Sequence, residues 1–406
     1  MQINLPYGNE TLGLTIPDKN LLGILKPNQP QQRPEINPEH LRAQLRNFLA
    51  GSKRILVIVN DYTRPTPTAD IISIIEPELK DLDFRFIVAC GSHRGPNQTE
   101  LSQIFGKHAQ IYKDKILVHD AKDNSLLKFL GKSKRGTPVW LNQAVWQAEK
   151  IIAINSVEPH YFAGFTGGRK SFLPGVAGLE SITANHKLSL QPASKTLSLD
   201  GNPVHEDMTE IAKMVPRDIF SIQIVINAEH ELCSVRYGDI ITSFMAAVSD
   251  AKQIFCVPAP QKADIVIALI QPPYDINFYQ SQKAIENAKL ALHDNGIMIV
   301  LSHCRDGIGD DEFIKIIAST NDLHQTLGKI DRHFILGYQK SAKLIQVIMR
   351  AQIWTVMPID DAIVKSVFMH PFNNLTDALA EALKQKGKDA KIIILPDASL
   401  TVPLIK

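Results

Sequence analysis

The chain has 406 residues, and its 44 Lys and Arg residues nearly balance its 42 Asp and Glu residues, which gives a formal net charge of +2. This balance argues against a nucleic-acid-binding protein, and 44% apolar with only 21% charged residues argues against intrinsic disorder. No apolar run approaches the roughly 18 residues of a membrane span, and the N-terminus MQINLPYGNE lacks the basic and apolar regions of a signal peptide, so we expect a cytoplasmic protein without membrane contacts.

The length allows about two or three domains. Residues 3–17 alternate around Gly8 and Asn9, which predicts a β-hairpin, and a Pro- and Gln-rich stretch over 26–40 leads into a helix at about 41–49. The four cysteines are widely spaced, so the sequence predicts neither a zinc knuckle nor a disulfide framework.

An alternating series of strands and helices follows. We predict strands at 54–59, 84–90, 115–119 and 150–154, a helix at 69–79, and a helix before Gly106 that begins with a capping box of Asn97 and Glu100. The strands are continuously apolar, as strands of a parallel sheet are when both faces of the sheet are covered.

A short proline-bearing connection at 257–262 precedes a second series of elements. This series comprises strands at 264–270, 296–301, 352–357 and 391–395 and a helix at 280–293. We predict two α/β domains with mostly parallel sheets and a ligand cleft between them. The predicted N-terminal domain spans 1–258, with a tail at 396–406 that returns to it, and the C-terminal domain spans 262–395.

Polar segments lie directly after several predicted strands, where open α/β sheets bind ligands. The segment at 60–65 offers Asp61 and Arg64, which either pair with each other or give Arg64 a carboxylate or phosphate to bind. The turn at 91–95 carries His93, which serves either as a structural hydrogen-bonding group or as a general base near neutral pH.

The densest signal is the loop at 155–170, which contains Glu158, His160 and a glycine-rich end. Gly167 and Gly168 allow a ligand to approach the backbone closely, and Arg169 and Lys170 add charge for an anion. The loop is not a Walker A motif, and the simpler reading is a generic phosphate-binding loop.

Two helices carry further candidates. His186 lies in a predicted helix at 179–190, where a histidine is commonly structural. Gln280 and Lys283, which follow Tyr279 at a helix start, share one helix face and are either solvated or directed into the cleft.

Five motifs together resemble the lactate racemase family, which uses a nickel-pincer cofactor. The motifs are DYTRP at 61–65, GSHR at 91–94, EPHYFAGFTGGRKSFLPG at 158–175, ANHKL at 184–188 and YQSQK at 279–283. The resemblance covers essentially the whole chain. It implies an isomerase that racemises or epimerises lactate or another 2-hydroxy acid by reversible hydride transfer.

The resemblance also implies the cofactor, a nickel-pincer nucleotide (pyridinium-3-thioamide-5-thiocarboxylic acid mononucleotide with nickel). Lys170 would be its covalent attachment point and His186 a metal ligand, as an imidazole suits nickel. Asp61, Thr166, Gly167, Gly168 and Arg169 would bind the cofactor. Dedicated synthesis enzymes would be maturation partners, and protein made in a host without them is expected to lack the cofactor.

By the same resemblance, His93 and His160 are the two acid/base residues. Arg64, Tyr279, Gln280 and Lys283 would bind the substrate. The sequence does not select one 2-hydroxy acid, and it is silent on oligomeric state.

Three alternatives stay open at this stage. One is a sugar-acid epimerase with the same cofactor, and another is a non-catalytic binder of a phosphorylated ligand in which the histidines are structural. The third is a nicotinamide-dependent dehydrogenase, which the missing GxGxxG fingerprint disfavours.

Overall fold

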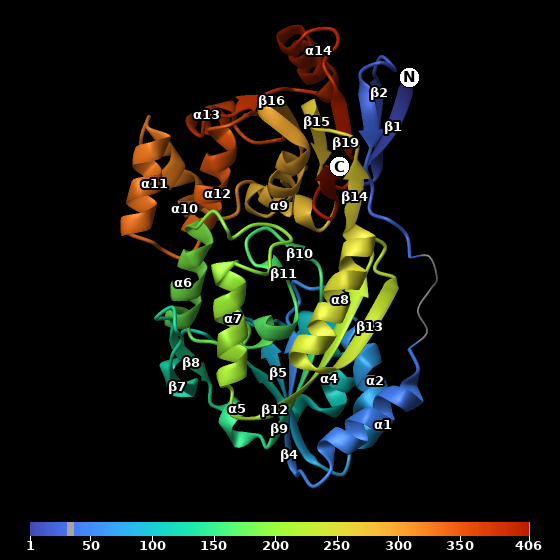
Figure 1. Ribbon diagram of the computed structural model, residues 1–406, viewed down its shortest axis with the longest axis vertical. Helices are drawn as coiled ribbons and strands as arrows, with labels where there is room; N and C mark the ends of the chain where they lie inside the picture. Colours follow the sequence, from blue (N-terminus) through green and yellow to red (C-terminus); the bar gives the residue numbers. More distant parts are fainter. Residues whose placement is uncertain (31–35, 406) are drawn as a thin grey trace. The chain divides into compact units, whose positions relative to one another are not determined.

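The computed structural model describes residues 1–30 and 36–405 (Figure 1). The chain forms two compact units, unit 1 from Met1–Asn28 and Ile254–Lys406, and unit 2 from Gln29–Gln253. Each unit contains a six-stranded sheet, and the strands within it are parallel except for one antiparallel edge pair in unit 2. The predicted α/β class with mostly parallel sheets is confirmed. None of the helices in the described residues is long and apolar enough to cross a membrane.

The sheet of unit 2 has the strand order β13-β12-β9-β4-β5-β6. Its strands are β4 (Arg54–Asn60), β5 (Asp83–Ala89), β6 (Ile116–Val118), β9 (Lys150–Ser156), β12 (Asp218–Ile226) and β13 (Leu232–Asp239). The antiparallel pair is β12 with β13. The strands predicted at 54–59, 84–90, 115–119 and 150–154 are confirmed as β4, β5, β6 and β9.

Helices cover the sheet of unit 2. They are α1 (Pro38–Leu49), α2 (Thr68–Leu79), α3 (Gln98–Phe105), α4 (His108–Ile111), α5 (Ala144–Gln147), α6 (Leu179–Lys187), α7 (Pro203–Met214) and α8 (Ile240–Phe255). Leucines of α1 and isoleucines of α2 form one core with Val57 and Val59 of β4. Leu56 and Ile58, on the opposite face of the same strand, are also fully buried. Both faces of β4 are therefore covered, which explains its continuous apolar sequence.

Short elements complete unit 2. They are the antiparallel pairs β7 (Leu127–Lys132) with β8 (Pro138–Asn142) and β10 (Pro159–His160) with β11 (Gly164–Phe165), and the 3₁₀ helix η3 (Gly168–Ser171). Helix α3 begins with the predicted capping box, because Asn97 accepts from the Glu100 amide and Glu100 accepts from the Asn97 amide.

The sheet of unit 1 has the strand order β18-β17-β16-β15-β19-β3. These strands are β3 (Leu21–Ile24), β15 (Ala263–Leu269), β16 (Leu292–Leu301), β17 (Gln352–Val356), β18 (His370–Pro371) and β19 (Ile392–Leu395). The helices are α9 (Phe278–Ala288), α10 (Asp311–Ala318), α11 (Leu323–Arg332), α12 (Tyr338–Ile348), α13 (Asp361–Ser366) and α14 (Leu375–Lys386). The helix predicted at 280–293 is shorter at its C-terminal end, because residues from Leu292 onward belong to β16.

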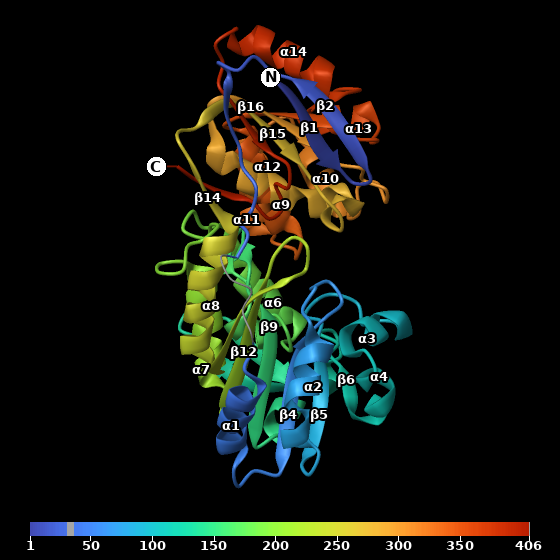
Figure 2. The same cartoon turned by 90° about the vertical axis from the view of Figure 1, so that its right-hand side faces the viewer.

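The predicted N-terminal hairpin is confirmed as β1 (Gln2–Tyr7) and β2 (Glu10–Thr15), but it does not belong to the unit that follows it in sequence. Ile3, Leu5 and Leu14 pack with the sheet of unit 1 and with α14, and Figure 2 shows the hairpin beside these elements. The predicted domain that began at residue 1 is therefore wrong for residues 1–28. Burial of apolar side chains, not proximity along the chain, decides where the hairpin lies.

The tail and the proline-bearing connection also differ from prediction. Residues 256–259 form a strand, β14 (Cys256–Ala259), which pairs in parallel with β20 (Val402–Ile405). The described part of the tail therefore belongs to unit 1 and does not return to the N-terminal domain. Residues 31–35 of the Pro- and Gln-rich stretch and residue 406 lie outside the described residues.

Asn20 links the N-terminal segment to unit 1 and offers a test of this arrangement. Its fully buried side chain donates to the carbonyls of Lys388 and Ala390, at 2.9 and 2.7 Å. Asn20→Ala leaves these carbonyls without their donor and is expected to lower the free energy of unfolding by about 1–3 kcal/mol. Urea denaturation measures the loss, with the exposed Asn4→Ala expected to stay within about 0.5 kcal/mol of wild type. An equal effect of both variants would contradict the proposed link.

Candidate functional site

The carboxyl ends of β4 and β5 bring Asp61 and His93 together. The two strands are parallel neighbours, and each residue lies in the loop after its strand. His93 Nδ1 lies 2.7 Å from Asp61 Oδ2, and Asp61 also accepts from the hydroxyl of Thr63 at 2.7 Å. The Asp61 side chain is buried and the His93 side chain about half exposed. The pair therefore joins a buried carboxylate to an accessible imidazole.

Opposing effects set the pKa of Asp61. Burial acts to raise it, but the hydrogen bond and charge of His93, together with Thr63 and Arg64, outweigh burial and hold the pKa below its ordinary value of 3.8. Asp61 is therefore ionised at neutral pH and can accept a hydrogen bond from His93 when Nδ1 carries the proton.

Arg64 pairs with Glu158 rather than with Asp61. Its Nη1 donates to Glu158 Oε1, and both side chains are largely buried. Glu158 lies just after β9, the strand on the other side of β4. The sequence pointed to Arg64 as an anion-binding residue but missed this partner, so a carboxylate ligand at Arg64 would share the guanidinium with Glu158 or displace it.

The glycine-rich loop after β11 is held tightly against the sheet. Thr166 Oγ1 accepts from the Glu158 amide at 2.9 Å and donates to the Ser156 carbonyl at 3.0 Å. Gly167 has φ +85°, and a Cβ there would lie 2.6 Å from Val157 and 2.7 Å from Gln223. Only glycine fits this position, because it has both an unfavourable φ for other residues and no free space.

Arg169 stabilises this loop from inside. Its fully buried guanidinium donates to the carbonyls of Ala163 at 2.7 Å and Gly167 at 3.1 Å, and it lies 4.4 Å from the centre of the Phe244 ring. Burial lowers its pKa to about 9. We expected Arg169 to present charge to a ligand, but the structure directs it to backbone carbonyls, so its effect on a ligand would be exerted through the shape of the loop.

Phe162 is the centre around which three predicted site residues gather. The ring of His160 lies edge-on to it with centroids 4.5 Å apart, and the ring of His186 does the same at 5.1 Å. Lys170 Nζ lies 5.9 Å from the centre of the same ring. The structure thus brings together His160 and Lys170 from one loop and His186 from helix α6.

His186 is buried and uncharged at neutral pH. Burial, the charge of Lys170 and the charge of His93 lower its pKa to about 3, against a smaller opposite effect of the Ile182 carbonyl. No atom among the described residues meets hydrogen-bonding geometry at its Nδ1. A buried neutral imidazole with an unsatisfied nitrogen has the properties of a metal ligand.

The side chains around His186 do not form a metal site by themselves. Residues 1–30 and 36–405 contain no group of three or more His, Cys, Asp or Glu side chains that could hold a metal ion. A metal bound at His186 would therefore take its other ligands from a cofactor. The lysine amine near His186 and the close-approach glycine loop fit such a group.

The predicted residues Tyr279, Gln280 and Lys283 belong to unit 1 and start helix α9. Asn277 caps this helix, because its side chain accepts from the Gln280 amide at 2.9 Å. Lys283 Nζ lies 4.1 Å from the centre of the Tyr274 ring, and burial followed by the charge of Asp310 raises the pKa of Tyr279 to about 12. All three side chains are half-buried at the carboxyl edge of the sheet in unit 1.

The structure reveals a second Asp–His pair, which the sequence analysis did not single out. His303 Nδ1 lies 2.9 Å from Asp275 Oδ2, and Arg305 contacts the other carboxylate oxygen at 3.2 Å. Asp275 follows β15 and His303 follows β16, the same arrangement that joins Asp61 to His93 in unit 2. The signal available in the sequence was the position of both residues directly after apolar strands.

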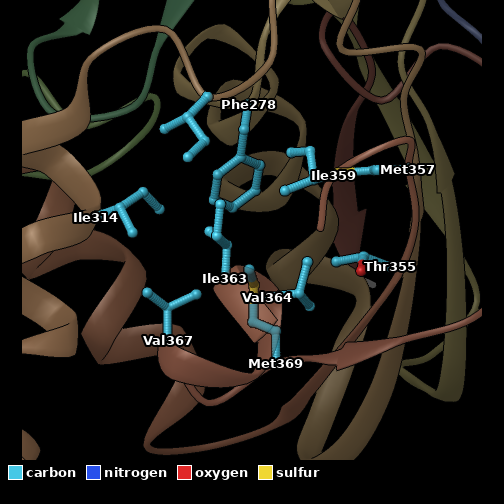
Figure 3. A pocket seen from close by; sticks show the side chains of 10 residues that line it. Phe278, Ile314, Thr355, Met357, Ile359, Ile363, Val364, Val367 and Met369 are labelled. Atoms are coloured by element: carbon cyan, nitrogen blue, oxygen red, sulfur yellow. The ribbon is translucent and has the colours of Figure 1, made fainter. Parts of the chain in front are cut away.

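Unit 1 also contains a small apolar pocket (Figure 3). Phe278 of α9, Ile314 of α10, and Val364 and Val367 near α13 face into it. Thr355 provides the one hydroxyl in a lining that is otherwise made of aliphatic, aromatic and methionine side chains. The pocket holds none of the predicted site residues.

Comparisons with known proteins agree with this picture. The family model described as lactate racemase N-terminal domain matches residues 7–197, and the model described as lactate racemase C-terminal domain matches residues 259–402. A lactate racemase of Thermoanaerobacterium thermosaccharolyticum is 30% identical over 97% of both chains. A lactate racemase of Lactiplantibacillus plantarum is 27% identical over 97% of this chain and 98% of its own.

Two solved structures are similar over nearly the whole chain. The lactate racemase apoprotein from T. thermosaccharolyticum matches with a TM-score of 0.90 and 27% identity, and each chain is fully covered. A protein from Thermotoga maritima matches with a TM-score of 0.71 and 17% identity over 92% of this chain and 100% of its own. The second match is a similarity of fold alone.

The tight packing of Gly167 gives a stability prediction. Gly167→Ala combines an unfavourable φ with contacts of 2.6 and 2.7 Å, whereas Gly201→Ala, at φ +72°, meets no atom within 4 Å. Gly201→Ala, the control, is expected to lower the free energy of unfolding by roughly 1–2 kcal/mol because of its backbone conformation. Gly167→Ala is expected to lower it more. Chemical denaturation of both variants measures the difference. Equal losses of stability in the two variants would show that the loop accommodates the added methyl group without a further loss of stability.

The Asp61–His93 pair predicts a pH-dependent stability. A carboxyl group whose pKa is lower in the folded than in the unfolded chain stabilises the fold above the unfolded value, here 3.8, and loses this effect as the pH falls through the folded pKa. Asp61→Asn is therefore expected to be less stable than wild type at neutral pH and to approach it below pH 3.8. Urea unfolding at several pH values measures the difference in the free energy of unfolding between wild type and Asp61→Asn. A difference between Asp61→Asn and wild type that stays constant over this pH range would contradict the assignment.

Proposed function

Because the chain belongs to the lactate racemase family, we propose that it is a racemase of lactate or a closely related 2-hydroxy acid. The observation that carries this proposal is the cluster of His160, Lys170 and buried His186 around Phe162. The Asp61–His93 pair accompanies it, because the charge of His93 acts on His186. His93 and His160 are the proposed acid/base residues, and Lys170 and His186 hold the cofactor. Arg64, Tyr279, Gln280 and Lys283 are the proposed substrate-binding residues.

The hydrogen bonds of the two histidines support complementary roles. Asp61 faces Nδ1 of His93, which places a proton there and leaves Nε2 of the neutral ring free to accept one. The amides of Phe162 and Ala163 face Nδ1 of His160, at 3.5 and 3.3 Å, so the neutral ring carries its proton at Nε2. Because Nδ1 of each ring is occupied by these contacts, Nε2 is the proposed proton-transfer nitrogen of both histidines.

Racemisation requires such a pair. The hydroxyl proton of either enantiomer must be removed when the 2-keto acid forms and returned when the hydroxy acid is restored. One neutral and one protonated imidazole meet this need from either enantiomer, because the neutral ring takes the hydroxyl proton in the first step and the protonated ring returns a proton in the second. Asp61, held ionised by His93, Thr63 and Arg64, stabilises His93 after it has accepted a proton.

The residues fit the nickel-pincer nucleotide that the resemblance implies. The amine of Lys170 would carry the covalent link, and the unsatisfied nitrogen of buried His186 would bind the metal. When bound, this cofactor supplies the acceptor and donor of the hydride on the substrate carbon, which side chains cannot provide. Asp61, Thr166, Gly167 and Gly168 would line its place, with Arg169 fixing the loop behind it.

The proposal also includes maturation partners and the binding of a carboxylate. Cofactor-synthesis enzymes would have to supply the nucleotide before the protein is active. Arg64 and Lys283 are the cations proposed to bind the substrate carboxylate, with Tyr279 and Gln280 beside Lys283. Lactate is the first substrate to test because both curated relatives are named for it.

The experiment is to co-express the protein with cofactor-synthesis enzymes and to measure intact mass, nickel content and the interconversion of D- and L-lactate. We expect added mass and about one nickel per chain, with both lost in Lys170→Ala. His93→Asn and His160→Asn are expected to keep nickel but to lose at least about 100-fold in kcat. His324→Asn, an exposed histidine of unit 1, serves as the control and should match wild type.

Two outcomes would overturn the proposal. Absence of both nickel and added mass, while the cofactor is demonstrably made, would exclude the tethered cofactor and favour a simple anion-binding loop. A fully loaded protein that racemises neither lactate nor any other 2-hydroxy acid would exclude the reaction while keeping the cofactor.

A further inference from the structure

A row of amide side chains crosses the apolar sheet of unit 2. Asn60 ends β4, Asn155 lies one residue before the end of β9, and Gln223 lies within β12. Gln223 and Asn155 are register partners, and Asn60 lies beside Asn155 because β4 and β9 pair in register up to the preceding residues. Asn155 and Gln223 are buried. Burying an amide is costly unless its polar atoms are hydrogen-bonded, so the row needs partners.

The amides bond to one another along the row. Asn155 Nδ2 donates to Asn60 Oδ1 at 2.9 Å, and Gln223 Nε2 donates to Asn155 Oδ1 at 3.4 Å. Gln223 Nε2 also donates to the buried hydroxyl of Ser221 on the same strand. The NH₂ groups of Asn155 and Gln223 are thus engaged within the sheet, and the oxygen atoms of both side chains can hold another segment.

Both oxygen atoms hold η3, the 3₁₀ helix that contains Lys170. Gln223 Oε1 accepts from the Gly168 amide at 2.9 Å, and Asn155 Oδ1 accepts from the Ser171 hydroxyl at 2.7 Å. Gly168 and Ser171 are the first and last residues of η3, and both are buried. Lys170 therefore lies in a short segment that is attached to the sheet at both ends.

The backbone of Lys170 is also bonded on both sides. Its amide donates to the Gly167 carbonyl at 3.1 Å, and its carbonyl accepts from the Gly175 amide at 3.0 Å. Gly175 approaches this segment closely, because a Cβ on it would clash with the carbonyl oxygen of Ser171. The sheet and the loop together therefore set the direction in which the Lys170 side chain leaves the backbone.

We propose that Gln223 and Asn155 are positioning residues for Lys170, which fix the place where the lysine amine meets the cofactor by holding both ends of η3. This inference rests on the proposed function, in which Lys170 carries the covalent link. Neither amide touches the cofactor in this proposal. They act through the Gly168 amide and the Ser171 hydroxyl, because a reacting group on a fixed segment spends more of its time in the productive geometry.

The test measures Lys170 in two ways. Intact mass, after a fixed period of co-expression with cofactor-synthesis enzymes, gives the fraction of chains that carry the cofactor. Acetylation of the unloaded full chain by acetic anhydride, followed by peptide mass spectrometry, gives the rate at half-buried Lys170 relative to Lys213, an exposed lysine in the last turn of α7. The second measurement needs no cofactor.

Gln223→Met keeps the length of the side chain but removes the oxygen that accepts from the Gly168 amide, and Ser171→Ala removes the donor at the other end of η3. We expect each variant to lower the loaded fraction at least about fivefold, because a misplacement of about 1 Å can slow a positioned reaction about 100-fold. The relative acetylation of Lys170 is expected to rise at least about threefold, because a released segment exposes the amine more often. Gln223→Glu keeps the oxygen and should restore both values toward wild type.

Asn227→Ala is the matched control. Asn227 is also a buried amide after β12, but its side chain accepts from the Glu229 and Glu231 amides and so holds the turn between β12 and β13. Its loading and relative acetylation should follow wild type, and an equal change in this variant would overturn the inference. Wild-type values in both Gln223→Met and Ser171→Ala would also overturn it, as would a Gln223→Glu variant that behaves like Gln223→Met. Should Gln223→Met fail to fold, Ser171→Ala decides.

The two measurements separate this inference from the proposed function. A wild type without added mass, while the cofactor is demonstrably made, would reject the proposed function, and the acetylation rates would still decide whether the two amides fix Lys170. Normal loading together with unchanged relative acetylation in both variants would reject this inference and leave the proposed function standing.

Discussion

Parallel strand pairing is the constraint on which both units depend. It brings the carboxyl ends of neighbouring strands to the same edge of the sheet, so that loops distant in sequence meet there. In unit 2 this joins Asp61 after β4 with His93 after β5, and in unit 1 it joins Asp275 after β15 with His303 after β16. The chemistry of each unit therefore follows from its strand order.

Buried polar groups divide into those that hold the site and those left available for ligands. Arg169 is costly to bury, and it is satisfied largely by carbonyls of its own loop, which makes that loop rigid. His186 is also buried, yet its Nδ1 has no hydrogen-bond partner among the described residues. In unit 1, the buried ammonium group of Lys340 donates to the Tyr279 carbonyl. An unsatisfied group such as His186 Nδ1 is one that a ligand can complete.

The family relationship and the geometry support each other at different levels. Similarity over nearly the whole chain establishes the family, and the contacts in unit 2 supply reasons why particular residues suit racemisation. Asp61 contacts Nδ1 of His93, whereas the backbone amides of Phe162 and Ala163 face Nδ1 of His160. The sequence motif could not predict the contacts at His160, because Phe162 and Ala163 make them through their backbone amides.

The sequence by itself determined the α/β class, the N-terminal hairpin, most strands of the first series and the motifs that carry the family resemblance, because these depend on local periodicity and residue type. It did not predict that the hairpin belongs to unit 1 or that Arg169 donates to carbonyls inside its own loop. It also did not predict the pairing of Arg64 with Glu158 or the hydrogen bond from Lys340 to the Tyr279 carbonyl. Only the tertiary structure decided these, because each is a contact between segments whose partners are chosen by burial and by the need of buried polar groups for hydrogen bonds.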